Sequence, residues 1–370
     1  MINDFRIKSR KELVKTPIVQ QTAFWSEVKK NLGIESLAFD FRVRENPASN
    51  VLSAGNTASD ILVLISRVGK DSSIAYVPYG PEYEPSTEEQ GIFLEELSEC
   101  IREFLPGNCL MIRYDLFWES VWANDPDYYN NGVWLGPPDK DFQEIRFNFN
   151  TVKWNFRKSG TNNLPSSTVF LDLRKDLASI RMAMKPKTRY NTELAFRRGV
   201  HVIETDDLMT WYNLYRETAL RNRLYMHNID YFRTVLSIHS KNTLSPAEVN
   251  LLVAMHDGQP LAAMFLVISG SRATYLYGAS SSSKRNLMAP YALQWHAIEL
   301  AKAKNCTEYD MFGVSPKPDP NHPLYGLYRF KTGFGGMIYH TLGCWDYPFD
   351  EQSYRSFSFS EMKSQGYHIN

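Results

Sequence analysis

Ten residues near the C-terminal end of the chain combine the groups that a reaction on a flat, charged ligand needs. Residues 327–336 read LYRFKTGFGG. Lys331 supplies a fixed positive charge, Phe330 and Phe334 supply stacking surfaces, and three glycines let a backbone approach a ligand closely. This combination suits a site that stacks a base or sugar while stabilising a developing oxyanion. The same residues also fit a glycine-bent β-hairpin with a solvated lysine.

Other common reaction centres are not predicted. The eight histidines show no HxxxH or HxH spacing, and the four cysteines (Cys100, Cys109, Cys306, Cys344) form no CxxC pair. A metal site is therefore not expected. Neither a G-x-S-x-G elbow nor a P-loop is present, so these sequence signals favour no serine-hydrolase or nucleotide-hydrolysing chemistry.

Length and charge limit the class of protein. A chain of 370 residues has room for two domains, and its formal net charge of zero argues against a non-specific nucleic-acid coat. One local run is nevertheless basic, with only Asp176 and Glu193 against Arg174, Lys175, Arg181, Lys185, Lys187, Arg189, Arg197 and Arg198. That run fits either a polyanion-binding surface or one polar helix face. The N-terminus has no apolar signal region, so a cytoplasmic location is expected.

A repeated order of elements must position these residues. In the first half we predict strands at 61–67 and 73–78, a helix at 88–104 and a strand at 109–114. In the second half we predict strands at 249–255, 261–268 and 273–277, a helix at 289–304 and a strand at 308–312. Helices are expected at 177–198, with a kink or break at Pro186, and at 206–221. Residues 117–160 are rich in aromatics and are expected to form an Ω-loop or an extra hairpin, or else to shape substrate choice.

Several segments resemble the FemABX family of peptidoglycan peptidyltransferases, in the same order along the chain. The run 330–336 resembles the FKxGFGG signature of that family. Further matches are Trp25 to Lys29, Tyr76 to Pro81, Lys187 to Asn191, Arg197 to Val200, Glu217 to Arg221, Tyr275 to Ser280, Ala289 to Trp295 and Tyr309 to Gly313. Together these segments span roughly residues 20 to 345.

The resemblance implies a mixed α/β fold of two tandem GNAT-like lobes, and the repeat described above agrees with that plan. The first lobe would comprise residues 1–163 together with a returning tail, 344–370. The second would comprise residues 164–343. No charged heptad segment is visible, so the coiled-coil arm of some relatives is not expected.

The resemblance further implies transfer of an amino acid from aminoacyl-tRNA to an amine of the peptidoglycan precursor's stem peptide. The precursor would be UDP-MurNAc-pentapeptide or lipid II. No metal or organic cofactor is needed, because the ester of the donor is already activated. The protein is expected to act as a monomer that can contact the inner face of the membrane peripherally.

Site residues follow from the same resemblance. Lys331 would stabilise the oxyanion, and Phe330 would stack on the terminal adenosine of the tRNA. Asp115 would act as a base or orient the amine, with proton transfer assisted by the substrate as the alternative. Precursor-binding positions are Lys29 and Arg221 at the diphosphate, with Arg223 as an alternative to Arg221, and Tyr277 and Tyr79 in the cleft.

Two rival functions stay open at this point. Arg285 to Pro290 stands where GNAT enzymes hold coenzyme A, but Met288 replaces a glycine and Pro290 lacks an N–H. One rival is therefore a GNAT-type N-acyltransferase that uses another activated donor, in exopolysaccharide or lipid assembly. The other is a non-catalytic protein that senses the precursor, although such a protein has no need of the cation Lys331.

Overall fold

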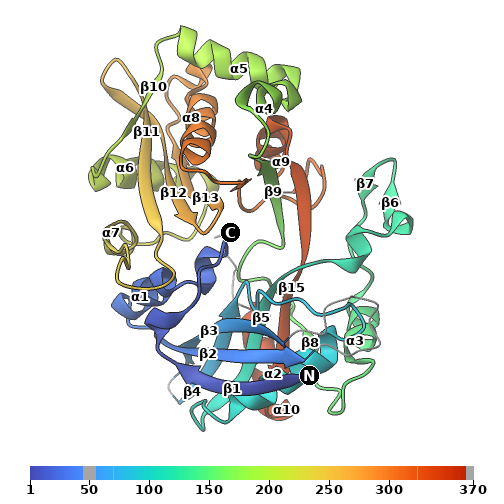
Figure 1. Ribbon diagram of the computed structural model, residues 1–370. Coiled ribbons are helices and arrows are strands. Elements are labelled where there is room, and N and C mark those ends of the chain that lie inside the picture. Colours follow the sequence, from blue (N-terminus) through green and yellow to red (C-terminus); the bar gives the residue numbers. More distant parts are fainter. Residues whose placement is uncertain (45–55, 70, 323, 364–370) are drawn as a thin grey trace.

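The chain folds around one long mixed sheet with helices packed along it (Figure 1). The computed structural model describes residues 1–44, 56–69, 71–322 and 324–363. Within these residues the main sheet has 13 strands, in the order β1-β2-β3-β4-β5-β15-β9-β14-β13-β12-β11-β10, with β8 pairing to β15. A separate hairpin is formed by β6 and β7.

The strands are as follows: β1 Ile2–Lys8, β2 Glu35–Arg44, β3 Asn56–Val68, β4 Ser72–Pro78, β5 Cys109–Glu119, β6 Tyr129–Asn130, β7 Val133–Trp134, β8 Arg157–Lys158, β9 Ser167–Asp172, β10 His201–Glu204, β11 Glu248–His256, β12 Gln259–Ser269, β13 Arg272–Ser280, β14 Glu308–Asp310 and β15 Met337–Pro348. The helices are α1 Ala23–Asn31, α2 Gln90–Arg102, α3 Lys140–Asn148, α4 Leu177–Ala183, α5 Pro186–Arg197, α6 Leu208–Asn222, α7 Ile229–Ser237, α8 Ala289–Ala303, α9 Tyr325–Lys331 and α10 Glu351–Lys363. Short 3₁₀ turns are η1 Arg10–Glu12, η2 Val19–Gln21, η3 Val121–Ala123, η4 Pro126–Tyr128, η5 Arg285–Leu287 and η6 Thr332–Phe334.

Each half of the sheet repeats one plan. Strands β2, β3 and β4 are antiparallel to one another, α2 follows, and β5 returns parallel to β4. In the same way β11, β12 and β13 are antiparallel, α8 follows, and β14 returns parallel to β13. A helix is needed between β4 and β5, and between β13 and β14, because a parallel return must cross the sheet. The mixed α/β fold predicted from the sequence is confirmed.

Strand β15 joins the two halves (Figure 1). Its first residues pair with β9 and its last residues pair with β5. Residues 344–348 and α10 therefore lie on the N-terminal half of the sheet, where Arg113 donates to Asp346 over 2.7 Å and to Glu361 over 2.9 Å. Residues 364–370 of the tail considered above lie outside the described residues.

The predicted helix at 177–198 is two helices. α4 ends at Ala183, and α5 begins at Pro186. Proline suits the first turn of a helix because its missing N–H would have no partner there, whereas inside a helix it clashes with the preceding turn. The longest helices among the described residues, α6 and α8, have 15 residues each. None of the described helices is long and apolar enough to cross a membrane.

A small buried cluster packs Tyr354 of α10 against Ile74 and Met111, and three larger clusters hold the sheet to its other helices. One packs α2 against the N-terminal half, and a second packs α4, α5 and α8 against the C-terminal half. The third takes residues from both halves, among them Trp25 and Leu62 with Trp211 and Phe265. Because burial of apolar area stabilises a fold roughly in proportion to that area, this shared cluster fixes the two halves against each other.

The aromatic-rich residues 117–160 contain the expected hairpin, β6–β7, and also a helix that the sequence did not predict, α3. Phe147 of α3 stacks on Trp345 of β15 with ring centres 4.2 Å apart. Trp134 of the hairpin stacks on His340 of the same strand at 3.8 Å. The segment is thus attached to the strand that joins the two halves.

Candidate active site

Lys331 lies at the end of α9 and is almost completely buried, with 4% of its surface exposed. Its ammonium group donates to the carbonyl oxygens of Phe312, at 3.0 Å, and Gly313, at 2.6 Å. The ring of Tyr275 lies 5.3 Å from the same nitrogen. The alternative of a β-hairpin with a solvated lysine is therefore wrong, because residues 325–334 are helical and the lysine points into the protein.

Burial lowers the pKa of Lys331 from 10.5 to about 7, and the nearby carboxylate of Asp310 opposes that change. Asp310 is itself buried and accepts hydrogen bonds from the Thr168 hydroxyl and, at 2.8 Å, from the Phe312 N–H. A buried ammonium with a pKa near neutrality gains from any new negative charge beside it. The position therefore suits a group that stabilises an anion formed during a reaction.

The segment Leu164–Pro165 connects the two halves. On one side it contacts Gly313, whose carbonyl binds Lys331, and on the other side it contacts Asp115. A Cβ on Gly313 would come within 2.6 Å of the Pro165 ring, so glycine is required for this contact. The Pro165 carbonyl accepts from the Tyr79 hydroxyl over 2.6 Å. The Leu164 N–H donates to Asp115 over 2.7 Å. Three predicted site residues, Lys331, Asp115 and Tyr79, thus surround one short connection.

Asp115 is fully buried at the centre of the sheet. Its Oδ2 accepts from Leu164 and, at 2.9 Å, from the hydroxyl of Tyr76. Burial raises the pKa of Asp115 to about 6, against the hydrogen bonds from Leu164 and Tyr76 that lower it. Both Asp115 and Tyr79 make their described polar contacts within the protein, an arrangement that holds the connection between the halves in place.

The glycines of the 330–336 run serve contacts within the protein. A Cβ on Gly333 would lie 2.2 Å from the Thr188 hydroxyl oxygen, and one on Gly335 would lie 2.4 Å from the Ala183 carbonyl. Gly335 also has φ +84°, a conformation that glycine adopts without strain. The expectation that these glycines admit a ligand is corrected: they let the α4–α5 turn pack against the residues that follow Lys331. The Lys185 N–H, which donates to the Gly333 carbonyl over 2.8 Å, fixes the same contact.

Phe330 is half-buried beside Lys331 on α9. Its ring meets Tyr291 of α8 edge-on at 5.0 Å and Phe334 edge-on at 5.4 Å. Edge-to-face packing on two neighbouring rings fixes the orientation of Phe330. The ring is therefore held rigidly next to the buried ammonium.

A second group of predicted residues gathers around Lys29, at the end of α1. The Lys29 ammonium lies 4.7 Å from the Trp25 ring and 5.7 Å from the Tyr231 ring. Tyr231 and Tyr277 share a hydrogen bond between their hydroxyls at 2.5 Å. Burial lowers the pKa of Lys29 to about 8. Lys29 and Tyr277, far apart in the sequence, are thus brought together through Tyr231.

Sequence reasoning missed two members of this group, Tyr231 and His227. The His227 ring stacks on Tyr231 at 4.1 Å, and burial together with the charge of Lys29 lowers the pKa of His227. The signal was weak: the two aromatics are four residues apart and flank Asn228, whose side chain caps α7 by accepting from the Tyr231 N–H. That spacing predicts that the two rings lie on one side of the start of a helix, but it does not predict that they lie beside Lys29.

A bulge in β13 separates two tyrosines, Tyr275 and Tyr277, that strict alternation along a strand would place on one face. Phe265 pairs with Tyr277 and Leu266 pairs with Tyr275, which leaves Leu276 as an extra residue. Tyr277 therefore packs toward Lys29, and Tyr275 packs toward α8 and Lys331. The two side chains lie on opposite sides of the sheet, because an extra residue in one strand reverses the alternation of side chains.

Arg221 and Arg223 lie at the end of α6 and are exposed. Arg221 donates to the Ser280 carbonyl over 2.9 Å and to the Ser282 hydroxyl over 3.0 Å, at the end of the strand that carries Tyr277. Arg223 ends α6 in a left-handed conformation with φ 51°. Of the two, Arg221 is the one anchored to β13, and it remains the better match to the predicted diphosphate position.

The basic run noted in the sequence lies on α4 and α5, next to the Lys331 region (Figure 1). Its two acidic residues are occupied locally: Asp176 caps α4, and Glu193 pairs with Arg181 at 2.7 Å. The exposed members of the run are Arg174, Lys175, Lys185, Lys187, Arg197 and Arg198. Lys185 also contacts the Thr332 hydroxyl at 3.4 Å, which ties this basic surface to the Lys331 region.

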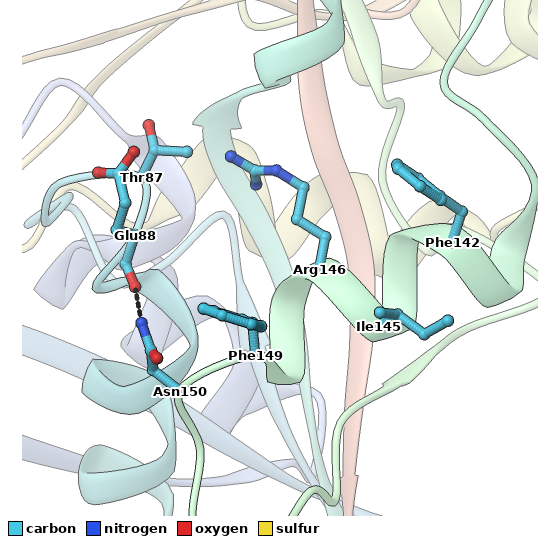
Figure 2. A pocket seen from close by; sticks show the side chains of 7 residues that line it. All are labelled: Thr87, Glu88, Phe142, Ile145, Arg146, Phe149 and Asn150. Atoms are coloured by element: carbon cyan, nitrogen blue, oxygen red, sulfur yellow. Dashed lines mark hydrogen bonds between the residues drawn. The ribbon is translucent and has the colours of Figure 1, made fainter.

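No metal cluster marks the set built above within the part of the chain that the structure describes. Over residues 1–44, 56–69, 71–322 and 324–363, no group of three or more His, Cys, Asp or Glu side chains could hold a metal ion. A cavity of about 310 Å³ lies elsewhere, between α3 and the loop before α2 (Figure 2). It shares no residue with the surroundings of Lys331 or Lys29.

Comparison with known proteins decides the family. A model described as the FemAB family matches residues 14–252 and 247–361. The chain belongs to the FemAB family. Three of the segments that resembled this family supply contacts at these groups: Trp25 to Lys29 includes Lys29 and the Trp25 ring, Tyr76 to Pro81 includes the hydroxyl that binds Asp115, and Tyr309 to Gly313 includes the carbonyls that bind Lys331.

Among curated relatives of this FemAB protein are enzymes named lipid II:glycine glycyltransferase. The one from Staphylococcus haemolyticus is 31% identical over 105 residues, which cover 28% of this chain and 25% of the relative. The one from Staphylococcus saprophyticus is 31% identical over 99 residues, which cover 27% of this chain and 24% of the relative. The aligned part thus spans about a quarter of each relative.

A solved structure described as FemX shares the fold of this FemAB protein. It covers 96% of this chain and 100% of its own, with a TM-score of 0.72 and 17% sequence identity. At that identity the likeness establishes the arrangement of strands and helices.

Proposed function

We propose that this FemAB protein transfers an amino acid from aminoacyl-tRNA to an amine of the peptidoglycan precursor's stem peptide. The amine nitrogen attacks the ester carbonyl carbon of the donor. The new C–N bond forms first and gives a tetrahedral oxyanion. Collapse of this oxyanion breaks the bond to the ribose oxygen, and that oxygen takes up the proton that the amine loses. The reaction is balanced without a cofactor, because the ester supplies the driving force.

The observation that carries the proposal is the placement of Lys331. An ammonium has three hydrogens to donate. Within the described residues, two of these hydrogens are donated to the carbonyls of Phe312 and Gly313. The third is then left to donate to a substrate oxygen. A fixed donor in a dry site stabilises a developing oxyanion far more than one in water.

The donor side is supported by the surface next to Lys331. Aminoacyl-tRNA is a polyanion, and the exposed cations of α4 and α5 adjoin the turn that packs against Gly333 and Gly335. Phosphate contacts by lysine and arginine position a nucleic acid without reading its sequence. The acceptor end of the tRNA would then reach Phe330 and Lys331.

The acceptor side is supported by the group around Lys29. Lysine and arginine bind phosphate oxygens, and aromatic rings pack against sugars and bases. Both kinds of surface are supplied by the group of Lys29, Tyr231, Tyr277 and His227. Arg221 of α6 binds the Ser280 carbonyl at the end of β13, the strand that carries Tyr277. We assign this group to the diphosphate and its attached sugar.

A coenzyme A donor fits this chain less well. The turn before α8 places Met288 in a left-handed conformation with φ 58°, and Pro290 lies in the first turn of the helix. A pyrophosphate at a helix start needs backbone N–H groups and close approach, which small residues allow. Met288 adds a large side chain there, and Pro290 removes an N–H.

The test is transfer of label with purified protein. Charged tRNAs carrying labelled amino acids would be mixed with either UDP-linked or lipid-linked stem peptide. Label on the peptide, abolished by ribonuclease and by Lys331→Met, would support the proposal and identify the amino acid. A matched control, Lys317→Met, removes an exposed lysine near the same helix. Label that stays on tRNA with both acceptors would overturn the proposal and favour an N-acyltransferase with another donor.

A further inference from the structure

Helix α3 buries polar side chains and exposes apolar ones. Its buried residues are Gln143, Phe147 and Asn148, two of them polar. Its outer side carries Phe142 and Ile145, which are 52% and 56% exposed, and Phe149 follows at 70%. A surface helix of a globular protein normally turns its apolar stripe inward. Here the apolar stripe faces out.

The reversal is stable because the buried polar groups are satisfied. The Gln143 amide donates to the Pro138 carbonyl over 2.7 Å. The Asn148 amide donates to the Phe156 carbonyl and its oxygen accepts from the Phe156 N–H, both over 2.9 Å. Buried polar groups cost little once they are paired in this way. Nothing in this packing requires aromatic or branched residues on the outer side.

The outer side borders a cavity of about 310 Å³ (Figure 2). Phe142, Ile145 and Phe149 line it from α3, and Thr87 and Glu88 line it from the loop before α2. Arg146 adds N–H donors at the same place, with its guanidinium carbon 5.6 Å from the centre of the Trp122 ring, and the Asn150 amide donates one N–H to the Glu88 carbonyl over 3.5 Å (Figure 2). The cavity thus combines apolar walls with donors suited to a phosphate.

We infer that Phe142, Ile145, Phe149 and Val152, here called the α3 patch, dock the protein on the surface of a phospholipid bilayer. Val152, three residues after Phe149, is 87% exposed. The cavity would admit part of an acyl chain, while Arg146 and Asn150 would contact headgroup phosphate. This inference rests on the proposed function and adds that the protein reaches a lipid-linked precursor at the bilayer surface.

Two observations favour a bilayer over a protein partner. The patch consists of large apolar side chains flanked by an exposed tryptophan, Trp154, and by Lys140 and Lys153, the residue types that surface-bound segments place at a membrane interface. The cavity beside the patch also has apolar walls from Phe142, Ile145 and Phe149, which suit an acyl chain. A peripheral docking surface is what an enzyme needs to reach a substrate anchored in lipid.

Because Lys140 and Lys153 pair with Glu144 and Glu99, insertion of apolar side chains rather than attraction to anionic lipid should dominate. Flotation with neutral phosphatidylcholine vesicles tests this. Wild type should float with the vesicles in low salt and in 0.5 M salt. The variant Phe142→Ser/Ile145→Ser/Phe149→Ser should bind at least tenfold more weakly. The control Ile7→Ser/Met209→Ser/Leu244→Ser, which alters three exposed apolar residues elsewhere, should bind like wild type.

Several results would overturn the inference: no flotation of wild type, equal loss in the control, or unchanged binding of the triple variant. A concentration-dependent dimer that the triple variant loses would assign the patch to a second copy instead. If the triple variant does not fold, as judged by circular dichroism, Phe149→Ser alone replaces it, because that side chain is the most exposed of the three.

Transfer assays separate this inference from the proposed function. With wild-type levels of transfer to a UDP-linked acceptor, the triple variant should transfer at least tenfold more slowly to a lipid-linked acceptor in vesicles. If wild type transfers to the soluble acceptor but does not bind vesicles, the inferred docking surface is wrong and the proposed transfer function stands. Vesicle binding without transfer from any charged tRNA would do the reverse.

Discussion

The ammonium nitrogen of Lys331 lies 2.6 Å from the carbonyl oxygen of Gly313, and Gly313 in turn lies directly against the Pro165 ring. Leu164, the residue before that proline, donates to Asp115. The buried cation of one half of the sheet and the buried carboxylate of the other are therefore held by the same two-residue connection. The geometry of the site depends on how the halves are joined.

Replacing Lys331 by methionine tests the role of the charge. If the ammonium stabilises an oxyanion, kcat should fall roughly 10²–10³-fold while the affinity for the precursor changes little. Single-turnover transfer and separate precursor binding would measure the two effects. A parallel loss of binding and rate would point instead to a binding role, and Lys317→Met should leave both unchanged.

The pH dependence of Lys331 can be measured in two ways. Because the pKa falls from 10.5 to about 7 on folding, the unfolded chain holds a proton between about pH 7 and 10.5 that the folded chain releases. The free energy of unfolding should therefore gain a contribution that rises with pH across that window, and Lys331→Met should remove it. In kinetics, kcat/KM should have a falling limb near pH 7, and Lys331→Arg should move that limb upward or abolish it.

Asp115 is expected to act by positioning rather than as a base. Asp115→Asn keeps an oxygen for the Leu164 N–H and should retain transfer within about tenfold, whereas Asp115→Ala should lose more, since it leaves that buried donor without a partner. Because burial raises the pKa from 3.8 to about 6, the stability linked to this group is present below about pH 4 and lost as pH rises through 6. Urea unfolding of wild type and Asp115→Asn at pH 4, 6 and 8 checks the sign. If Asp115→Asn loses as much rate as Asp115→Ala, the result would favour Asp115 as a general base.

Gly333 should tolerate alanine only when Thr188 shrinks. A Cβ on Gly333 would lie 2.2 Å from the Thr188 hydroxyl oxygen but 3.4 Å from its Cβ. Gly333→Ala alone should destabilise the protein by roughly 1–3 kcal/mol, and adding Thr188→Ala should recover most of that loss. Thermal melts of the two single variants and the double variant measure the coupling. Gly326→Ala, where a Cβ meets open space, is the matched control, and simple additivity of the two changes would contradict the contact.

Lys29 should bind precursor, and its neighbour Lys30 provides the control. Lys29→Met removes the ammonium beside Trp25 and Tyr231 and should raise the precursor KM about tenfold or more with a smaller change in kcat. Lys30→Met changes an exposed lysine one residue on and should have no effect. Tyr277→Phe, which removes one partner of the Tyr231 hydroxyl, should fall between the two. Titration of UDP-linked and lipid-linked precursor gives both constants.

The basic surface of α4 and α5 should bind RNA in a salt-dependent way. Lys187→Glu/Arg197→Glu should weaken binding of charged tRNA and make the dependence of log K on log salt shallower by up to about one unit for each phosphate that the variant no longer neutralises. Lys15→Glu/Lys241→Glu makes the same charge change on other exposed residues. Equal weakening in both variants would show only an effect of overall charge.

Much of this protein follows from the sequence alone. Continuous runs of β-branched and other apolar residues predicted the strands at 61–67 and 261–268. Helical periodicity predicted α2, because that pattern turns one side of a helix toward the core, and a helix was also predicted where α8 lies. Pro186 predicted a break between α4 and α5. The order of short segments from Trp25 to Gly336 indicated the family, which the match over residues 14–361 confirms.

The tertiary structure decided what those patterns leave open, namely which surfaces meet. The glycines after Lys331 proved to fit Ala183 and Thr188, a contact between segments far apart in the sequence. One extra residue in β13 turned Tyr275 and Tyr277 to opposite sides. Helix α3 exposes the apolar side that its sequence would place inside, because paired Gln143 and Asn148 occupy the core instead. Periodicity fixes the faces of one segment, whereas register and hydrogen-bond satisfaction depend on partners that only the assembled fold supplies.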